Sequence, residues 1–89
     1  MSLSPKGLQQ TPIPLSCLPV GASAVVRSLA STGTLRRRML DLGFLPGAIV
    51  ETLQKSPAGD PIAYLIRGTV IALRSGDAEN ILVEEDYAD

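Results

Sequence analysis

Three consecutive arginines, Arg36, Arg37 and Arg38, form the densest group of chemically active side chains in the sequence. Neighbouring residues of a helix point about 100° apart, so the three guanidinium groups cannot all face one ligand and instead wrap the exposed side of a helix. They are either a contact surface for a partner or a solvated helix face supported by an Arg37–Asp41 pair one turn apart. Cations near a helix N-terminus oppose the helix dipole, which slightly strengthens the case for a contact surface, although a solvated face is the simpler interpretation.

The chain has no histidine and one cysteine, Cys17, which excludes cysteine–histidine metal clusters, an internal disulfide and a Ser–His–Asp triad. A glycine-rich phosphate loop with its lysine is also absent from the sequence. We therefore expect no enzyme, no cofactor and no specific metal site, and we expect Cys17 to be a small buried apolar residue. Iron would have to bind carboxylates alone, and the acidic groups near the C-terminus are more typical of a solvated end: Glu84, Glu85, Asp86 and Asp89.

Length and charge narrow the function classes further. The 89 residues allow one small domain, and 45% of them are hydrophobic, which is typical of a folded chain. A net charge of −1 gives no field that would attract nucleic acid or an anionic membrane. The longest apolar run, 62–66, has five residues, whereas a membrane-spanning helix needs about 20. We expect a cytoplasmic binding module that contacts neither nucleic acid nor the membrane interior.

The order of turns and apolar alternation predicts one domain with an irregular segment at each end. We expect a flexible N-terminal arm at 1–14, a domain at 15–84 and an acidic tail at 85–89. Within the domain, the patterns predict strands at 23–29, 49–55, 62–67, 69–74 and 79–84 and one helix at 35–42. Five short strands with one helix inserted after the first indicate a mainly β fold, a small closed or nearly closed barrel.

The helix has a well-defined predicted end. Thr34 is positioned to cap its start, and Gly43 stands where a left-handed residue is needed at its end. Phe44 then either packs back on Met39 or, with Leu45, forms an apolar docking knob, and packing is the simpler interpretation. The candidate partner-binding residues are Arg36, Arg37, Arg38, Phe44 and Leu45.

Several segments together resemble the FeoA family, small cytosolic accessory proteins of bacterial ferrous iron transport. The resemblance covers about residues 15–84 and is most specific in the run that ends Leu42-Gly43-Phe44-Leu45-Pro46-Gly47. The other matching segments are 15–21, 35–41, Asp60-Pro61, Arg67-Gly68, 72–74 and 81–83.

The resemblance implies an SH3-like barrel and a non-catalytic adaptor that contacts the FeoB-type membrane transporter. A similar domain forms the C-terminal part of DtxR-type iron-dependent repressors, which implies a regulatory domain as the alternative. The DNA-binding region of those repressors has no counterpart in this sequence. Self-association is left open.

Overall fold

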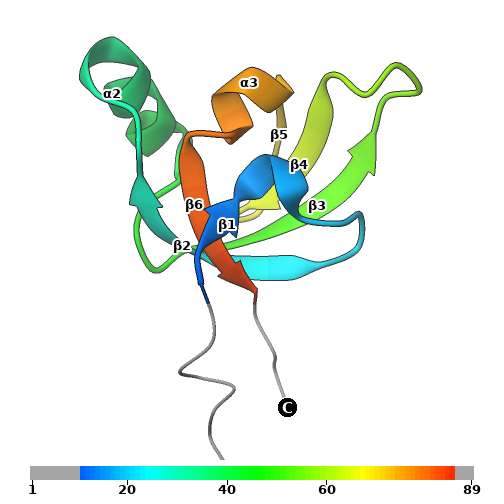
Figure 1. The fold of residues 1–89 in the computed structure, drawn as a ribbon, viewed down its shortest axis with the longest axis horizontal. Helices are drawn as coiled ribbons and strands as arrows, with labels where there is room; N and C mark the ends of the chain where they lie inside the picture. The colour runs from blue at the N-terminus through cyan, green and yellow to red at the C-terminus, as the bar shows by residue number, and fades with distance from the viewer. Residues whose placement is uncertain (1–10, 86–89) are drawn as a thin grey trace, which may run out of the picture.

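The β-branched and apolar segments of the chain become strands of one antiparallel sheet (Figure 1). A computed structural model describes residues 11–85, and the strands lie in the order β1-β6-β2-β3-β4-β5. The elements in chain order are β1 (Ile13–Pro14), the 3-10 helix η1 (Leu15–Cys17), β2 (Ser23–Leu29), α2 (Gly33–Leu42), β3 (Ile49–Lys55), β4 (Ile62–Ile66), β5 (Thr69–Leu73), α3 (Ser75–Ala78) and β6 (Ile81–Glu85). The prediction of a mainly β fold is confirmed, with one strand more than expected.

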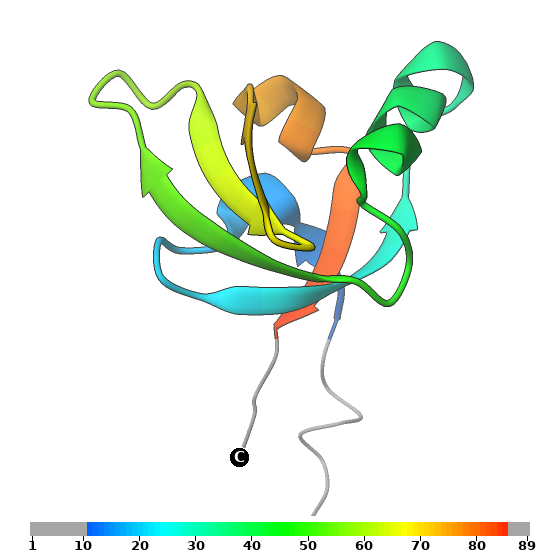
Figure 2. The same cartoon turned by 180° about the vertical axis from the view of Figure 1, so that it is seen from behind.

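Alternate residues of each strand point into a single core. Along β4, Ile62, Tyr64 and Ile66 are buried, whereas the residues between them are partly exposed. On β3, Val50 and Thr52 take the inward positions and pair with Ile66 and Tyr64 across the sheet. The strongly curved sheet therefore has an inner face that forms the core and an outer face that is open to solvent (Figures 1 and 2).

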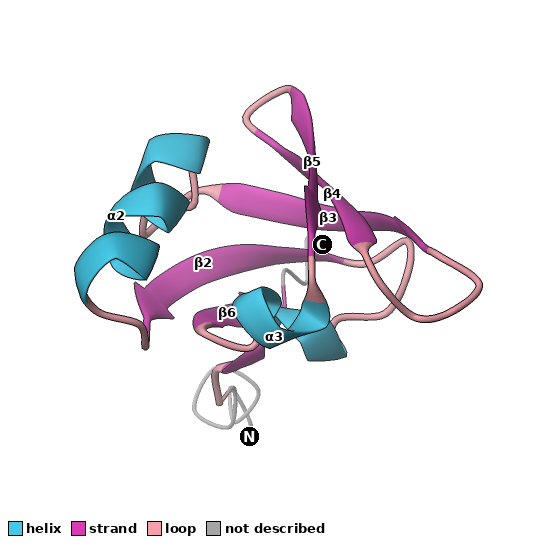
Figure 3. Ribbon diagram, turned by 90° about the horizontal axis from the view of Figure 1, so that it is seen from above, coloured by secondary structure: helices cyan, strands magenta, loops and turns pink. Residues whose placement is uncertain are grey.

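Helix α2 lies at one end of the sheet, beyond the ends of β2 and β6 (Figure 3). It begins earlier than the sequence predicts, at Gly33, so the predicted Thr34 cap is wrong: Thr32 is the N-cap residue and makes no side-chain capping bond. Gly33 has a φ of 62°, which lets the chain turn sharply into the helix before Thr34. The predicted end is confirmed, because Gly43 has a φ of 112° and its N–H donates to the Leu40 carbonyl at 3.0 Å.

The N-terminal boundary differs from the prediction. Ile13 and Pro14, assigned by the sequence to the flexible arm, form β1 and pair with Val83 and Leu82 of β6. Ile13 also packs against the core, and Pro14 fits an edge strand because such a strand needs fewer backbone donors. The rest of the predicted arm at 1–10, and the predicted tail at 86–89, lie outside the described residues.

The segment after β5 forms the short helix α3, which the sequence patterns did not predict. The carboxylate of Asp60 accepts hydrogen bonds from the Ser75 backbone N–H at 2.8 Å and from the Ser75 hydroxyl at 3.1 Å. Ala78, the last residue of α3, is buried. The loop between β3 and β4 is thereby joined to the residues that follow β5.

Cys17 is exposed, so its prediction as a buried apolar residue is wrong. It ends η1, whose short turn directs Leu15 into the core, and the next inward position is taken by Leu18. Of the helices between residues 11 and 85, none has the length and apolar character needed to cross a membrane.

Candidate contact surfaces

The arginines of α2 are all exposed, as their place in the sequence predicts. Arg36 and Arg37 come together with Gly33, Leu40 and Asp41 around an open pocket of about 380 Å³, and Arg38 is not part of its lining. No ion pair joins Arg37 to Asp41; the ion pair among the described residues runs from Arg27 Nε to Glu84 Oε1, at 2.9 Å. The guanidinium groups of α2 are therefore available to a partner.

Phe44 and Leu45, which follow α2, differ in burial. Phe44 is 0% exposed and belongs to the same core cluster as Met39, and its backbone N–H donates to the Met39 carbonyl at 3.1 Å. The packing interpretation is thus correct for Phe44, whose side chain offers no surface to a partner. Leu45 is exposed and stays a candidate contact residue.

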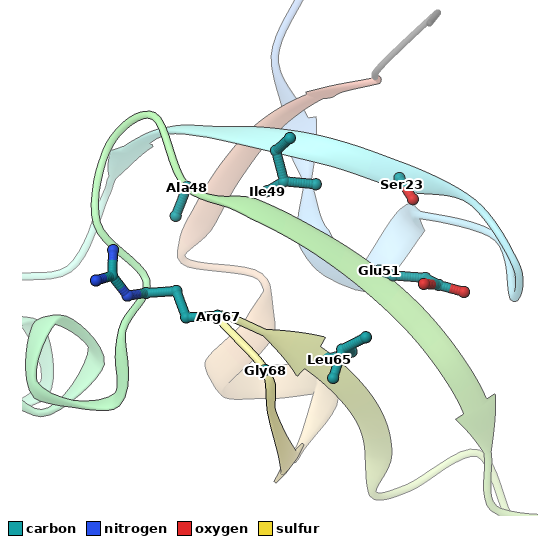
Figure 4. A pocket seen from close by; sticks show the side chains of 7 residues that line it. All are labelled: Ser23, Ala48, Ile49, Glu51, Leu65, Arg67 and Gly68. Atoms are coloured by element: carbon teal, nitrogen blue, oxygen red, sulfur yellow. The ribbon is translucent and has the colours of Figure 1, made fainter.

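A second surface lies on the outer face of the sheet. One row of paired residues crosses four strands there and consists of Ser23, Glu51, Leu65 and Val70. An open pocket of about 440 Å³ lies over this face, and Figure 4 shows the side chains that line it: Ser23, Ala48, Ile49, Glu51, Leu65, Arg67 and Gly68. This surface, which we call the outer-face pocket, is apolar at its centre and has one cation and one anion at its rim.

The outer-face pocket was not predicted from the sequence, although one signal for it was present. The alternation of β3 puts Ile49 on the same face as the charged Glu51, so a large apolar residue stands on the outward side of the strand. Ile49 is 55% exposed, and Val70 on β5 is 62% exposed. Large apolar side chains in such positions are more informative than the buried ones, because the core does not require them.

Among residues 11–85, one titratable group has a strongly perturbed pKa. Burial raises the pKa of Tyr64 to about 12, with smaller contributions from the negative charges of Asp60 and Cys17. The Tyr64 hydroxyl is buried and has no hydrogen-bond partner. Tyr64 therefore stays protonated at neutral pH and does not exchange protons with a ligand. Within residues 11–85, no three Cys, Asp or Glu side chains gather as metal ligands would.

A sequence profile of the FeoA domain matches residues 13–85, almost the whole of the described chain. The chain belongs to the FeoA domain family. Its FeoA domain is 37% identical over 70 residues to the Fe(2+) transport protein A/Fe(2+) transporter FeoB fusion protein of Porphyromonas gingivalis. The match covers 79% of this chain and 8% of the fusion protein, so the chain corresponds to a small part of that relative.

Solved structures of other FeoA proteins have the same fold. The solution structure of FeoA from Chlorobium tepidum is 38% identical with a TM-score of 0.80, over 86% of this chain and 73% of that one. The zinc-complexed FeoA of Stenotrophomonas maltophilia, described as a procaryotic SH3 domain protein, is 34% identical with a TM-score of 0.71, over 82% and 88% of the two chains.

IdeR of T. acidophilum contains a similar barrel. It is 18% identical with a TM-score of 0.74, and the match covers 85% of this chain and 35% of IdeR. At this identity the likeness establishes a common fold between the FeoA domain and the matched part of IdeR, and nothing about their functions.

Proposed function

We propose that this FeoA domain is a non-catalytic cytoplasmic adaptor of ferrous iron transport that acts by contacting a FeoB-type membrane transporter. The observation that carries the proposal is the fusion relative, in which a segment 37% identical to this chain is joined to an Fe(2+) transporter FeoB in one polypeptide. A covalent link holds two modules at an effective concentration in the millimolar range, so it favours pairs whose contact is weak when they are separate.

The composition supports an adaptor over an enzyme. With no histidine and one exposed cysteine, the chain lacks the side chains of the common nucleophile–base pairs. The tyrosine in its core is held in the protonated form by burial, as its raised pKa of about 12 indicates. Function then depends on what the surface of the domain binds.

The arginine face of α2, made of Arg36, Arg37 and Arg38, is the first contact surface that we propose. The chain as a whole has a net charge of −1, so three exposed cations on one helix form a local positive patch. Such a patch attracts an acidic surface and raises the association rate, and arginine is enriched in protein interfaces. Leu45 lies just beyond the C-terminal end of the helix and adds an exposed apolar contact.

The experiment is a triple Arg→Glu variant at 36, 37 and 38, tested for binding to the transporter's soluble and membrane parts separately and for iron uptake in cells that lack the native protein. We expect unchanged folding, because surface substitutions usually alter stability by about 0.5 kcal/mol or less, and binding weakened by a few kcal/mol. A triple Arg→Lys variant keeps the positive charge and should retain most of the binding.

A second control adds negative charge elsewhere, through Gln54→Glu, Lys55→Glu and Ala58→Glu at the exposed end of β3 and its loop. This variant should bind like the parent. If the folded Arg→Glu variant binds the transporter and restores uptake like the parent, the arginines of α2 form only a solvated helix face and do not contact the transporter. A regulatory role like that of the repressor domains has only the shared fold in its favour.

A further inference from the structure

Strand β5 forms one edge of the sheet, and the turn before it determines which of its backbone groups face outward. Arg67 and Gly68 have φ values of 50° and 81°, the pattern of a two-residue type I′ hairpin turn. In such a hairpin Ile66 and Thr69 form a hydrogen-bonded pair, and hydrogen-bonded pairs alternate along the strands. Tyr64–Ile71 and Ile62–Leu73 are then the next such pairs. The N–H and C=O groups of Val70 and Ala72 consequently point away from β4.

Those outward groups meet no other part of the described chain. The backbone hydrogen bonds that join loops, turns and strand ends include none from Val70 or Ala72. In the view from behind, β5 lies in front of the other strands, with no element drawn over it (Figure 2). The strand contains no proline, no bulge and no charged residue, which are the features that usually protect a sheet edge.

The outer face beside this edge is apolar. Val70 is 62% exposed and stands opposite Leu65, and Ala72 stands opposite Ala63. From Leu65 the apolar surface continues into the outer-face pocket (Figure 4). A strand added along β5 would therefore place alternate side chains on an apolar surface.

Charge at the two ends of β5 decides what kind of segment fits. Arg67 precedes the strand and Arg74 follows it; both are exposed, and neither takes part in the ion pair recorded between residues 11 and 85. If a second copy paired its own β5 antiparallel to this one, with Val70 opposite Ala72, each Arg67 would lie beside the other copy's Arg74. Like charges at both ends oppose that pairing. Carboxylates at both ends of an incoming strand would instead be attracted.

We propose that the free edge of β5 binds an extended segment of a partner protein that is apolar in its middle and acidic at each end. Backbone hydrogen bonds to Val70 and Ala72 provide the binding, and Arg67 and Arg74 select the segment by charge. This inference rests on the proposed function in that it names a site for the adaptor's partner, and it concerns a surface separate from α2.

A synthetic peptide with blocked ends, Glu-Val-Thr-Val-Thr-Glu, tests the edge without the transporter. Added to the ¹⁵N-labelled protein, it should shift the amide signals of β5 and slow hydrogen exchange at Val70 and Ala72. The same peptide with lysine at both ends should bind at least tenfold more weakly. Absence of shifts at β5, shifts confined to another surface, or equal binding of the lysine peptide would overturn the proposal. So would a concentration-dependent dimer paired through β5, because the occupant would then be a second copy.

Two matched variants extend the test to binding of the transporter. Val70→Lys puts a charge on the edge, and Val20→Lys makes the same change at a residue that is 53% exposed away from it. Both should melt like the parent, and only Val70→Lys should lose binding to the peptide and to the transporter, by at least tenfold. If the parent binds the transporter and Val70→Lys binds equally well, the edge proposal fails and the adaptor proposal stands. If the parent does not bind the transporter, the adaptor proposal fails and the peptide titration still decides whether β5 accepts a strand.

Discussion

The two edge strands of the sheet, β1 and β5, differ in how much unpaired backbone they present to solvent. β1 is two residues long, and one of them is Pro14, which has no N–H to donate. β5 has five residues without proline or charge, and its most exposed side chain is a valine. Short strands and proline are common protections against unwanted strand pairing, and β1 has both.

The contrast indicates that the exposure of β5 is tolerated for a reason. Both strands lie at an edge of the sheet, yet one edge is protected and the other is not. Natural proteins that keep an open, apolar edge commonly use it to bind an extended segment. Substitutions in and around the β4–β5 hairpin distinguish a firmly held edge from a loose one.

The largest effect is expected from Ile66→Ala, on the inner face of the β4–β5 hairpin. Ile66 is 0% exposed, so the truncation leaves a cavity and should lower the free energy of unfolding by about 2–5 kcal/mol. Ile49→Ala, the same change at a side chain that is 55% exposed, should cost much less. Denaturant titration measures both. Equal costs would mean that the hairpin is loosely attached and that its edge is open only through mobility.

Alkaline pH tests whether the interior behind β5 is dry. Tyr64 has a pKa raised to about 12 from its ordinary value of 10.0, so the unfolded chain loses this proton first as the pH rises. The associated stability is complete below pH 10 and is lost between about pH 10 and 12. Two pKa units correspond to roughly 3 kcal/mol.

Tyr64→Phe is the control for that titration. It should remove this part of the pH dependence and, because the hydroxyl has no partner, leave stability at neutral pH unchanged or raised by up to about 1 kcal/mol. A parent protein whose unfolding is no more sensitive to pH 10–12 than the Phe variant would show that solvent reaches Tyr64.

Gly43→Ala tests the junction between α2 and the hairpin. The new Cβ would lie 3.3 Å from Arg67 Cδ, and the φ of 112° is unfavourable for any residue with a side chain. We expect a loss of roughly 1–2 kcal/mol in thermal or chemical unfolding. Gly43→Asn should lose less, because asparagine tolerates left-handed conformations better than alanine. Unchanged stability in the alanine variant would contradict the strained helix end.

Ala72→Pro should have the smallest effect, because its N–H points away from β4 and gives up no bond of the sheet. We expect a loss of about 1 kcal/mol or less, whereas Ile71→Pro, which removes a bond to β4, should cost about 3 kcal/mol or more. Melting temperatures of the two variants give the comparison. The reverse order would mean that the outward residues of β5 have been assigned to the wrong side.

The sequence predicted most of the fold because the strands are regular. The strand at 49–55 follows from the alternation of its apolar and polar residues. The helix end follows from Gly43, because a glycine directly after a helix is typical of a left-handed end residue. The start of α2 could not be predicted as easily, because Gly33 in a left-handed conformation replaces the side-chain cap expected of Thr34. β1 escaped prediction because its pairing with β6 joins residues almost 70 positions apart, and no local pattern encodes that contact.

The candidate contact residues were predictable to the extent that charge was involved. Arg36, Arg37 and Arg38 are exposed, as three adjacent arginines must be on a short helix. The role of Phe44 was ambiguous because a residue after a helix can pack inward or project outward. Which of the two occurs depends on whether the folded core has space for the side chain, and Phe44 is buried there. The open edge of β5 depends on sheet order and on the I′ turn at Arg67-Gly68, which exist only once the strands have been placed.

The pairing of β1 with β6 brings the two ends of the folded unit side by side, with Ile13 opposite Val83 (Figure 1). A domain whose entry and exit are adjacent can be inserted into a surface loop of another protein without stretching either chain, and it tolerates circular permutation. Joining these ends by a short linker and opening the exposed loop at 57–59 should yield a permuted protein with the same barrel. In such a permutant the β5 edge and the arginines of α2 would keep their positions, whichever end of the chain is attached to a host.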